Sequence, residues 1–336
     1  MPISWLRVVP WALLGASTLA CGEAPAAGAA PKRIELPEVR LEIPTSGLPT
    51  PMVRNDAFRR GIVLGPLVAP EDEQGWKKQH VALLDRALAR GVTDLQLVVQ
   101  WMQTSTSAVE IAPFESVHDT LLSWLIDQAT QRDLRVWLTP RVSVENEASW
   151  AVRGLAPSNW ERWWWSYQRI ALHYAKVAAT RKVAMYAIGA ELSSTEGQLD
   201  RWRKLIKAVR KIYNGKLTYL AAADSFDKVQ FWDGLDVVAI AVDQAEPRSE
   251  AQLLELLSPL PKRIGRSSKA RDLGYVISEA SCGEGPRDDA RELLCQRALF
   301  RSFGEEPKLQ GVFVSPAPER GKTHDVVSHW YKNSQG

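Results

Sequence analysis

The feature that most constrains the fold is an alternation of short β-rich runs with longer amphipathic runs along residues 51–336. Short runs of this kind predict strands, and longer runs with apolar residues at helical spacing predict helices. The expected strands are residues 60–64, 94–99, 134–138, 182–188, 217–220, 235–241, 275–278 and 311–314. The expected helices are residues 79–90, 121–131, 160–180, 198–213, 250–257 and 290–303.

Eight strands, most of them followed by a helix, predict an α/β protein built as a single (β/α)8 TIM barrel. Such a barrel takes roughly 250 residues plus loops, and residues 51–336 supply that length. The alternative is an open, doubly wound sheet. No glycine-rich phosphate-binding turn follows the first strand, which disfavours a nucleotide-binding version of that sheet. We expect no second domain.

The start of the chain has the character of an export signal. Residues 8–16 are apolar and follow Arg7, and small residues continue up to Cys21. This pattern is typical of a secretory signal and is too short for a permanent membrane-spanning helix. Residues 18–21 read Thr-Leu-Ala-Cys, a bacterial lipoprotein box apart from its first position, so lipidation of Cys21 is expected. The alternative is cleavage near Ala20 or Ala24 and a soluble secreted protein.

The expected organisation is a lipoprotein signal peptide (1–20), a lipidated cysteine with a flexible linker (21–50) and the barrel (51–336). The linker is rich in Pro and Ala and has no apolar periodicity. We therefore expect a monomer held in the bacterial cell envelope, at the outer membrane, by its lipid. In an oxidising compartment Cys282 and Cys295 are expected to form a disulfide; the alternative is two free buried thiols.

Composition and missing motifs exclude several classes of protein. The chain has 42 Lys and Arg against 39 Asp and Glu, a formal net charge of +3, which argues against a nucleic-acid binder. Its hydrophobic fraction of 45% is that of an ordinary globular protein rather than a multi-span membrane protein. The five His residues have no metal-ligand spacing, and no Gly-x-Ser-x-Gly turn occurs. We expect neither a metal nor a cofactor.

Two carboxylates stand at the ends of the fourth and seventh predicted strands. The fourth strand leads into Glu191 and the seventh into Glu279. Functional side chains of a barrel gather at the carboxyl ends of its strands. Two converging carboxylates about 5 Å apart are what retaining glycoside hydrolysis needs, one kept protonated to donate to the leaving oxygen and one ionised to attack the anomeric carbon. The alternative is that both are rim residues paired with Lys or Arg.

Four further residues that follow strands are candidates for substrate binding. Trp101 offers a face on which a sugar stacks, or else packs in the core. Arg141 meets either a carboxylate of the substrate or one of the two Glu. Asp224 and Asp243 either bind sugar hydroxyls or cap helices. The excess of Trp, 14 against 7 Tyr and 7 Phe, fits either sugar stacking or core packing.

Three short motifs carry a resemblance to a known family. They are Ile-Gly-Ala-Glu-Leu (188–192), Phe-Trp-Asp-Gly-Leu-Asp (231–236) and Ile-Ser-Glu (277–279). In this order they resemble the bacterial endo-β-mannanase-like TIM-barrel glycoside hydrolases of clan A, family 113, over most of residues 58–315. The resemblance implies that Glu191 is the general acid/base and Glu279 the nucleophile. It also implies a retaining glycosidase that needs no cofactor and acts on a polysaccharide such as a β-mannan.

The chain departs from this family at positions expected to surround the sugar. The third strand ends in Thr-Pro-Arg141 where the family tends to have Lys-Pro-His. Smaller or apolar residues replace polar or aromatic ones at Ala190, Ala223, Val242 and Ser315. Two functions therefore stay open. One is cleavage of a polysaccharide, and the other is a catalytically inactive barrel lipoprotein that binds glycan or serves envelope assembly.

Overall fold

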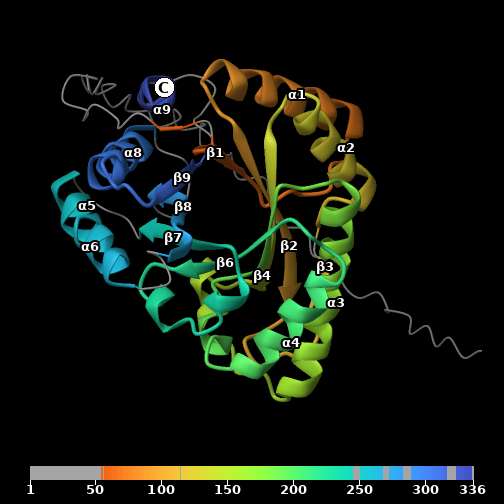
Figure 1. Cartoon of the computed structure of the whole chain (residues 1–336). Coiled ribbons are helices and arrows are strands. Elements are labelled where there is room, and N and C mark those ends of the chain that lie inside the picture. Colours follow the sequence, from red (N-terminus) through yellow and green to blue (C-terminus); the bar gives the residue numbers. More distant parts are fainter. Residues whose placement is uncertain are drawn as a thin grey trace, which may run out of the picture. The chain divides into compact units, whose positions relative to one another are not determined.

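The β-rich runs of the sequence pair side by side as the eight parallel strands of a closed barrel (Figure 1). A computed structural model describes residues 54–55, 57–113, 115–244, 250–267, 272–282, 289–315 and 323–334. The barrel strands are β1 (Arg59–Leu64), β2 (Asp94–Gln103), β4 (Arg135–Val144), β5 (Met185–Ala190), β6 (Lys216–Ala222), β7 (Val237–Gln244), β8 (Tyr275–Cys282) and β9 (Leu309–Val314). They follow one another around the ring in this order, and β9 pairs with β1 to close it. The predicted TIM barrel is confirmed.

Helices surround the ring of strands (Figure 1). They are α1 (Glu73–Ala89), α2 (Asp119–Thr130), α3 (Trp160–Thr180), α4 (Leu199–Arg210), α5 (Glu250–Leu257), α6 (Pro259–Arg266), α8 (Asp289–Phe303) and α9 (Thr323–Asn333). The 3₁₀ turns are η1 (Ser149–Gly154), η2 (Ser193–Thr195), η3 (Phe226–Lys228) and η4 (Trp232–Gly234). The two-residue strand β3 (Ala112–Pro113) pairs antiparallel with the end of β2, outside the ring.

Two helices, α6 and α9, and the strand β3 were not predicted. The α6 segment was not recognised as a helix because two prolines, Pro259 and Pro261, lie in its first turn. Proline is tolerated there, since the first N–H groups of a helix have no partner within it. Strands β2 and β4 also run further toward their carboxyl ends than predicted, to Gln103 and Val144. This extra length extends the barrel at the carboxyl ends of β2 and β4, where Arg141 lies.

The barrel interior is filled by side chains in layers. Trp137 and Phe313 pack edge to face with ring centroids 4.9 Å apart. A Cβ on Gly61 would lie 2.1 Å from the Phe313 ring, so glycine is required at this position. Above this apolar layer, buried Gln96 donates a hydrogen bond to Thr139 (3.2 Å). Its carbonyl oxygen accepts one from Ser278 on the opposite wall. The floor of the barrel mouth is thus closed and polar.

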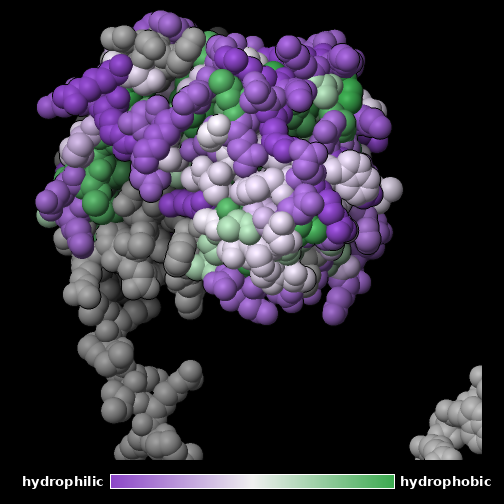
Figure 2. Space-filling model, turned by 90° about the horizontal axis from the view of Figure 1, so that it is seen from below, coloured by the Kyte–Doolittle hydropathy of each residue, from purple (hydrophilic) through white to green (hydrophobic). Residues whose placement is uncertain are grey.

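Four of the 14 tryptophan side chains serve core packing. Trp137, Trp163, Trp202 and Trp330 are all fully buried. Trp202 of α4, for example, stacks on Phe231 with ring centroids 4.8 Å apart. Core packing therefore explains these indoles better than sugar stacking. The face in Figure 2 is largely hydrophilic, and its apolar side chains form small, separate patches.

The predictions about the first 50 residues, including the signal peptide, Cys21 and the linker, lie outside the described residues. Within the described residues, no helix combines the length and the apolar composition needed to cross a bilayer. The disulfide stays a prediction. Cys295 is buried in α8, whereas the side chain of Cys282 lies outside the described part of the chain.

Candidate active site

A cavity of about 450 Å³ opens at the carboxyl ends of the barrel strands. Its walls come from β1, β2, β4 and β8 and from the segments that follow them, and it includes the predicted site residues Arg141 and Glu279. The lining residues are Val63, Gly65, Pro66, Val98, Gln100, Met102, Arg141, Ser143, Val144, Asn146, Glu147, Glu279 and Ser315. This is the end of a TIM barrel at which ligands bind.

Both predicted carboxylates sit on an unusual backbone. Glu191 directly follows β5 with φ of 53°, and Glu279 lies in β8 with φ of 51°. The strand register also shifts just before Glu191, between Ala187 and Ala190, and around Glu279, between Ile277 and Ala280. Such bulges redirect side chains, and left-handed backbone at residues other than glycine concentrates at functional sites. The same combination of a register shift and a left-handed backbone therefore sets the direction of both carboxylate side chains.

A single guanidinium joins the two carboxylates. Nη1 of Arg141 lies 2.9 Å from Oε2 of Glu279, and Nη2 of the same side chain contacts Oε2 of Glu191. Because one side chain contacts both carboxylates, Glu191 and Glu279 lie at one centre, and each is paired with Arg as the alternative expected. The predicted convergence of these carboxylates is found, and Arg141 contacts both of them.

A second arginine, which the sequence analysis missed, completes the centre. Arg153 of η1 donates through Nη2 to Oε1 of Glu191. Buried Ala151 and Val152 anchor this turn against the core, which holds Arg153 over the end of β5. Nothing in the local sequence marks this residue, because its contact depends on the path of the connection between β4 and α3. Each oxygen of Glu191 thus accepts from a different arginine.

The arginines reverse the expected protonation of Glu191. Burial alone raises its pKa, but Arg141 and Arg153 outweigh burial and lower the pKa below its ordinary value. The sequence analysis expected one of the two Glu to be kept protonated as the acid. In this arrangement Glu191 is instead held as a carboxylate, because two cations stabilise its charge.

Glu196 is a second buried acid that the sequence analysis missed. Burial raises its pKa to about 7, although a hydrogen bond from Tyr219 (2.9 Å) favours the charged form. The raised pKa means that the folded state holds a proton which the unfolded state releases near pH 4.5. Stability is therefore greatest below that pH, falls as the pH rises toward 7, and stays reduced above it.

Glu196→Gln is expected to stabilise the protein at pH 8 and to have little effect at pH 4. Gln imitates the protonated carboxyl group and still accepts from Tyr219, so the cost of burying a charge disappears. That cost is about 3 kcal/mol at most. Urea unfolding at the two pH values measures it, with exposed Glu305→Gln as the control. A gain of the same size at both pH values would contradict this origin.

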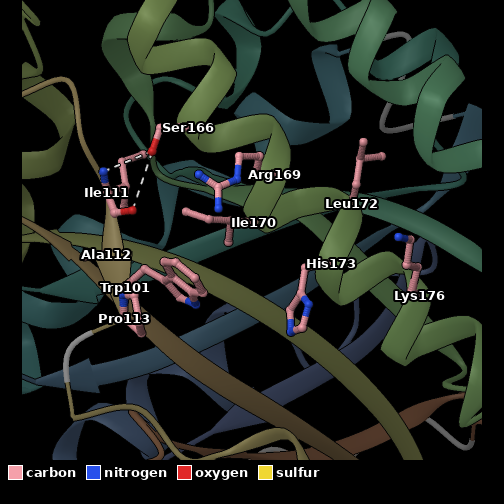
Figure 3. Close-up of a pocket in the computed structure, with 10 residues that line it drawn as sticks. All are labelled: Trp101, Ile111, Ala112, Pro113, Ser166, Arg169, Ile170, Leu172, His173 and Lys176. Atoms are coloured by element: carbon pink, nitrogen blue, oxygen red, sulfur yellow. Dashed lines mark hydrogen bonds between the residues drawn. The ribbon is translucent and has the colours of Figure 1, made fainter.

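Trp101, a predicted substrate-binding residue, does not join this centre. Trp101 lies on the outer face of β2, where its indole N–H donates to the Tyr174 hydroxyl (3.0 Å). There it lines a separate cavity of about 550 Å³ between the β2–β3 hairpin and α3. Figure 3 shows Trp101 and Pro113 on one side of that cavity and His173 of α3 on the other. The structure therefore separates Trp101 from the two carboxylates.

Of the two predicted Asp residues, only Asp224 has a described side chain. Asp224 is exposed in the turn after β6, where its backbone carbonyl accepts from Arg263 (3.0 Å). Asp243 belongs to β7, but its side chain is outside the described part of the chain. Among the described residues, no group of His, Cys, Asp and Glu side chains is arranged to hold a metal ion.

Comparisons with known proteins agree with the geometry. The family model described as Glycoside Hydrolase Family 113 matches residues 72–284, a range that contains both carboxylates. The β-mannanase AaManA of that family, from Alicyclobacillus acidocaldarius, superposes with a TM-score of 0.71 at 18% identity, covering 82% of this chain and 97% of the other. A β-1,4-mannanase of the same family gives a TM-score of 0.69 at 20% identity, with 82% and 99% covered. None of the curated proteins compared gives a match.

Proposed function

Because this chain belongs to glycoside hydrolase family 113, we propose that it cleaves a β-linked polysaccharide of the mannan type with retention of configuration. The observation that carries the proposal is the pair of carboxylates bound to one guanidinium at the open end of the barrel. A pair at this place can flank one glycosidic bond. The two similar solved structures are both mannanases, which supports a mannan as the polysaccharide backbone.

The two carboxylates take different roles in the proposed reaction. Glu279 lines the cavity, so its carboxylate attacks the anomeric carbon and forms a glycosyl-enzyme. Glu191 gives a proton to the departing glycosidic oxygen and then takes a proton from the water that releases the sugar. The charge of Arg141 stabilises Glu279 as the ionised nucleophile. No step calls for a metal or a cofactor.

The test uses the purified protein on a panel of β-linked polysaccharides. We expect new reducing ends from a β-1,4-mannan backbone, and proton NMR of the first product should show the β-anomer before mutarotation. Appearance of the α-anomer would overturn the retaining mechanism. Absence of any new reducing ends across the panel would overturn hydrolysis.

The ion pairs of Glu191 with two arginines favour a second candidate function. A carboxylate bound by two cations is a poor proton donor, so a non-catalytic glycan-binding barrel would tolerate this arrangement. Calorimetric titration with oligosaccharides, run beside the reducing-end assay, separates the candidates. Binding without cleavage supports the second one.

For localisation we propose export and anchoring through a lipid on Cys21, with residues 22–50 as the tether. The apolar stretch before Cys21 and the Pro-rich composition after it support this proposal. Cys21→Ala should move the protein from the membrane fraction to the soluble fraction of cells. An unchanged distribution would contradict the anchor.

A further inference from the structure

Glu191 is held between two arginines, an arrangement that cleavage of an uncharged sugar does not require. Its two oxygens accept from Arg153 and from Arg141. Only 3% of its side chain is exposed. A general acid must present a proton on an oxygen that faces the glycosidic oxygen. With both oxygens engaged by guanidinium groups, Glu191 needs one of them to leave before it can carry that proton.

The two arginines are nearer the solvent than the carboxylate they hold. The side chain of Arg141 is 19% exposed and that of Arg153 is 29% exposed. Arg141 pairs with both Glu279 and Glu191, so its departure would break both of these ion pairs. Arg153 is the more exposed of the two and sits on a connection between elements rather than on a barrel strand. Its greater exposure makes Arg153 the arginine that a ligand entering from solvent reaches more easily.

The described ion pairs of the centre join two arginines to two glutamates: Arg141 pairs with Glu191 and Glu279, and Arg153 pairs with Glu191. A neutral sugar entering the cavity gives neither arginine a reason to move. A sugar that carries a carboxylate offers Arg153 a planar partner for paired hydrogen bonds, the contact for which a guanidinium is best suited. The added negative charge also makes protonation of Glu191 more favourable.

On the premise that the proposed hydrolase function holds, we propose that the substrate is an anionic, carboxylate-bearing β-glycan, and that Arg153 is its specificity residue. The sugar carboxylate binds Arg153 and draws it away from Glu191. Glu191 then takes one proton from solvent. That proton passes to the glycosidic oxygen as its bond to the anomeric carbon breaks, while the Glu279 carboxylate forms the new bond to that carbon.

The test compares two oligosaccharides that differ only at carbon 6. One is a β-1,4-linked mannuronate oligomer, and the other is its carboxyl-reduced form, a β-1,4-mannan oligomer of equal length. We expect the full chain to bind the mannuronate about tenfold more tightly or better in calorimetry, and to lose that preference as salt rises. Equal or tighter binding of the neutral oligomer would overturn the anionic substrate.

Variants of Arg153 assign the preference to this side chain. Arg153→Gln should bring the two affinities together, whereas Arg153→Lys should keep part of the difference, because it keeps the charge. A general structural defect would weaken both oligomers alike, so the ratio of the two affinities is the readout. Arg162→Gln, which removes an exposed arginine of α3 paired with Glu110, is the matched control. A ratio unchanged in Arg153→Gln would overturn the role of Arg153.

The reducing-end assay on the same two oligomers tests the hydrolase function separately from the preference for an anionic substrate. Cleavage of the neutral oligomer with no preference for the anionic one leaves the hydrolase function standing and overturns the anionic substrate. Binding of the anionic oligomer without cleavage overturns the hydrolase function and leaves only the preference of Arg153 for an anionic glycan. Binding of neither oligomer counts against both.

Discussion

Replacing Glu279 with Gln is expected to lower kcat on a cleavable polysaccharide by about 10³-fold or more. Gln has nearly the same shape but cannot form the glycosyl-enzyme, and Glu279 is the carboxylate that lines the cavity. Glu191→Gln should lower kcat by about 10²- to 10⁴-fold, the range expected for loss of a general acid. Reducing-end assays on both variants measure these losses.

The leaving group separates the two roles. An aryl glycoside with a good leaving group needs no proton in the first step, so it should restore the formation of glycosyl-enzyme in Glu191→Gln but not in Glu279→Gln. Glu145→Gln is the control, because Glu145 is exposed beyond the end of β4 and does not line the cavity. Unchanged turnover in both site variants would remove the catalytic assignment.

The two-residue period of a strand accounts for much of what could be predicted, and for one residue that was misplaced. On β2, Gln96 and Val98 face the barrel interior, and Gln100 continues that side into the cavity. Trp101 must then face outward, toward α3, where the structure has it. Strand periodicity alone, applied to β2, could have separated Trp101 from the carboxylates. The same rule correctly places Arg141 two residues beyond inward-facing Thr139.

The carboxylates themselves do not follow this simple period. Each stands at a shift of strand register and has a left-handed backbone, and neither feature is written in the local sequence. Their convergence was predictable only from the rule that barrel chemistry gathers at the strand ends. The contact of Arg153 with Glu191 was out of reach, because it joins residues 38 positions apart through an irregular connection.

Arg141 and Arg153 relate to the positions at which this chain differs from the family pattern. Where the family tends to have His at the end of the third strand, this chain has Arg141, and that side chain now holds both carboxylates. A second cation, Arg153, pairs with Glu191. Two arginines that contact the same buried carboxylate indicate a specific site rather than a single chance substitution. This arrangement supports the proposal that Arg153 recognises an anionic sugar.

At the opposite end of the barrel, Asp94→Asn is expected to reduce the free energy of unfolding by about 3–5 kcal/mol. Asp94 is fully buried at the start of β2. It accepts from Arg59 of β1 (2.8 Å) and from Arg135 of β4 (2.5 Å). One carboxylate therefore ties three neighbouring strands together. Asn keeps the shape but leaves buried Arg59 without its counter-charge, and that uncompensated charge is the source of the loss.

Urea unfolding, followed by tryptophan fluorescence, measures this effect. The matched control is Asp85→Asn, which breaks an exposed pair with Arg132 of nearly the same length (2.8 Å), since the Asp85 side chain is 58% exposed. An exposed pair contributes about 0–1 kcal/mol, so the control should barely move the unfolding midpoint. If Asp94→Asn cost no more than Asp85→Asn, the buried carboxylate would not hold the strands together. The closure of the barrel would then rest on its backbone pairing and apolar layers alone.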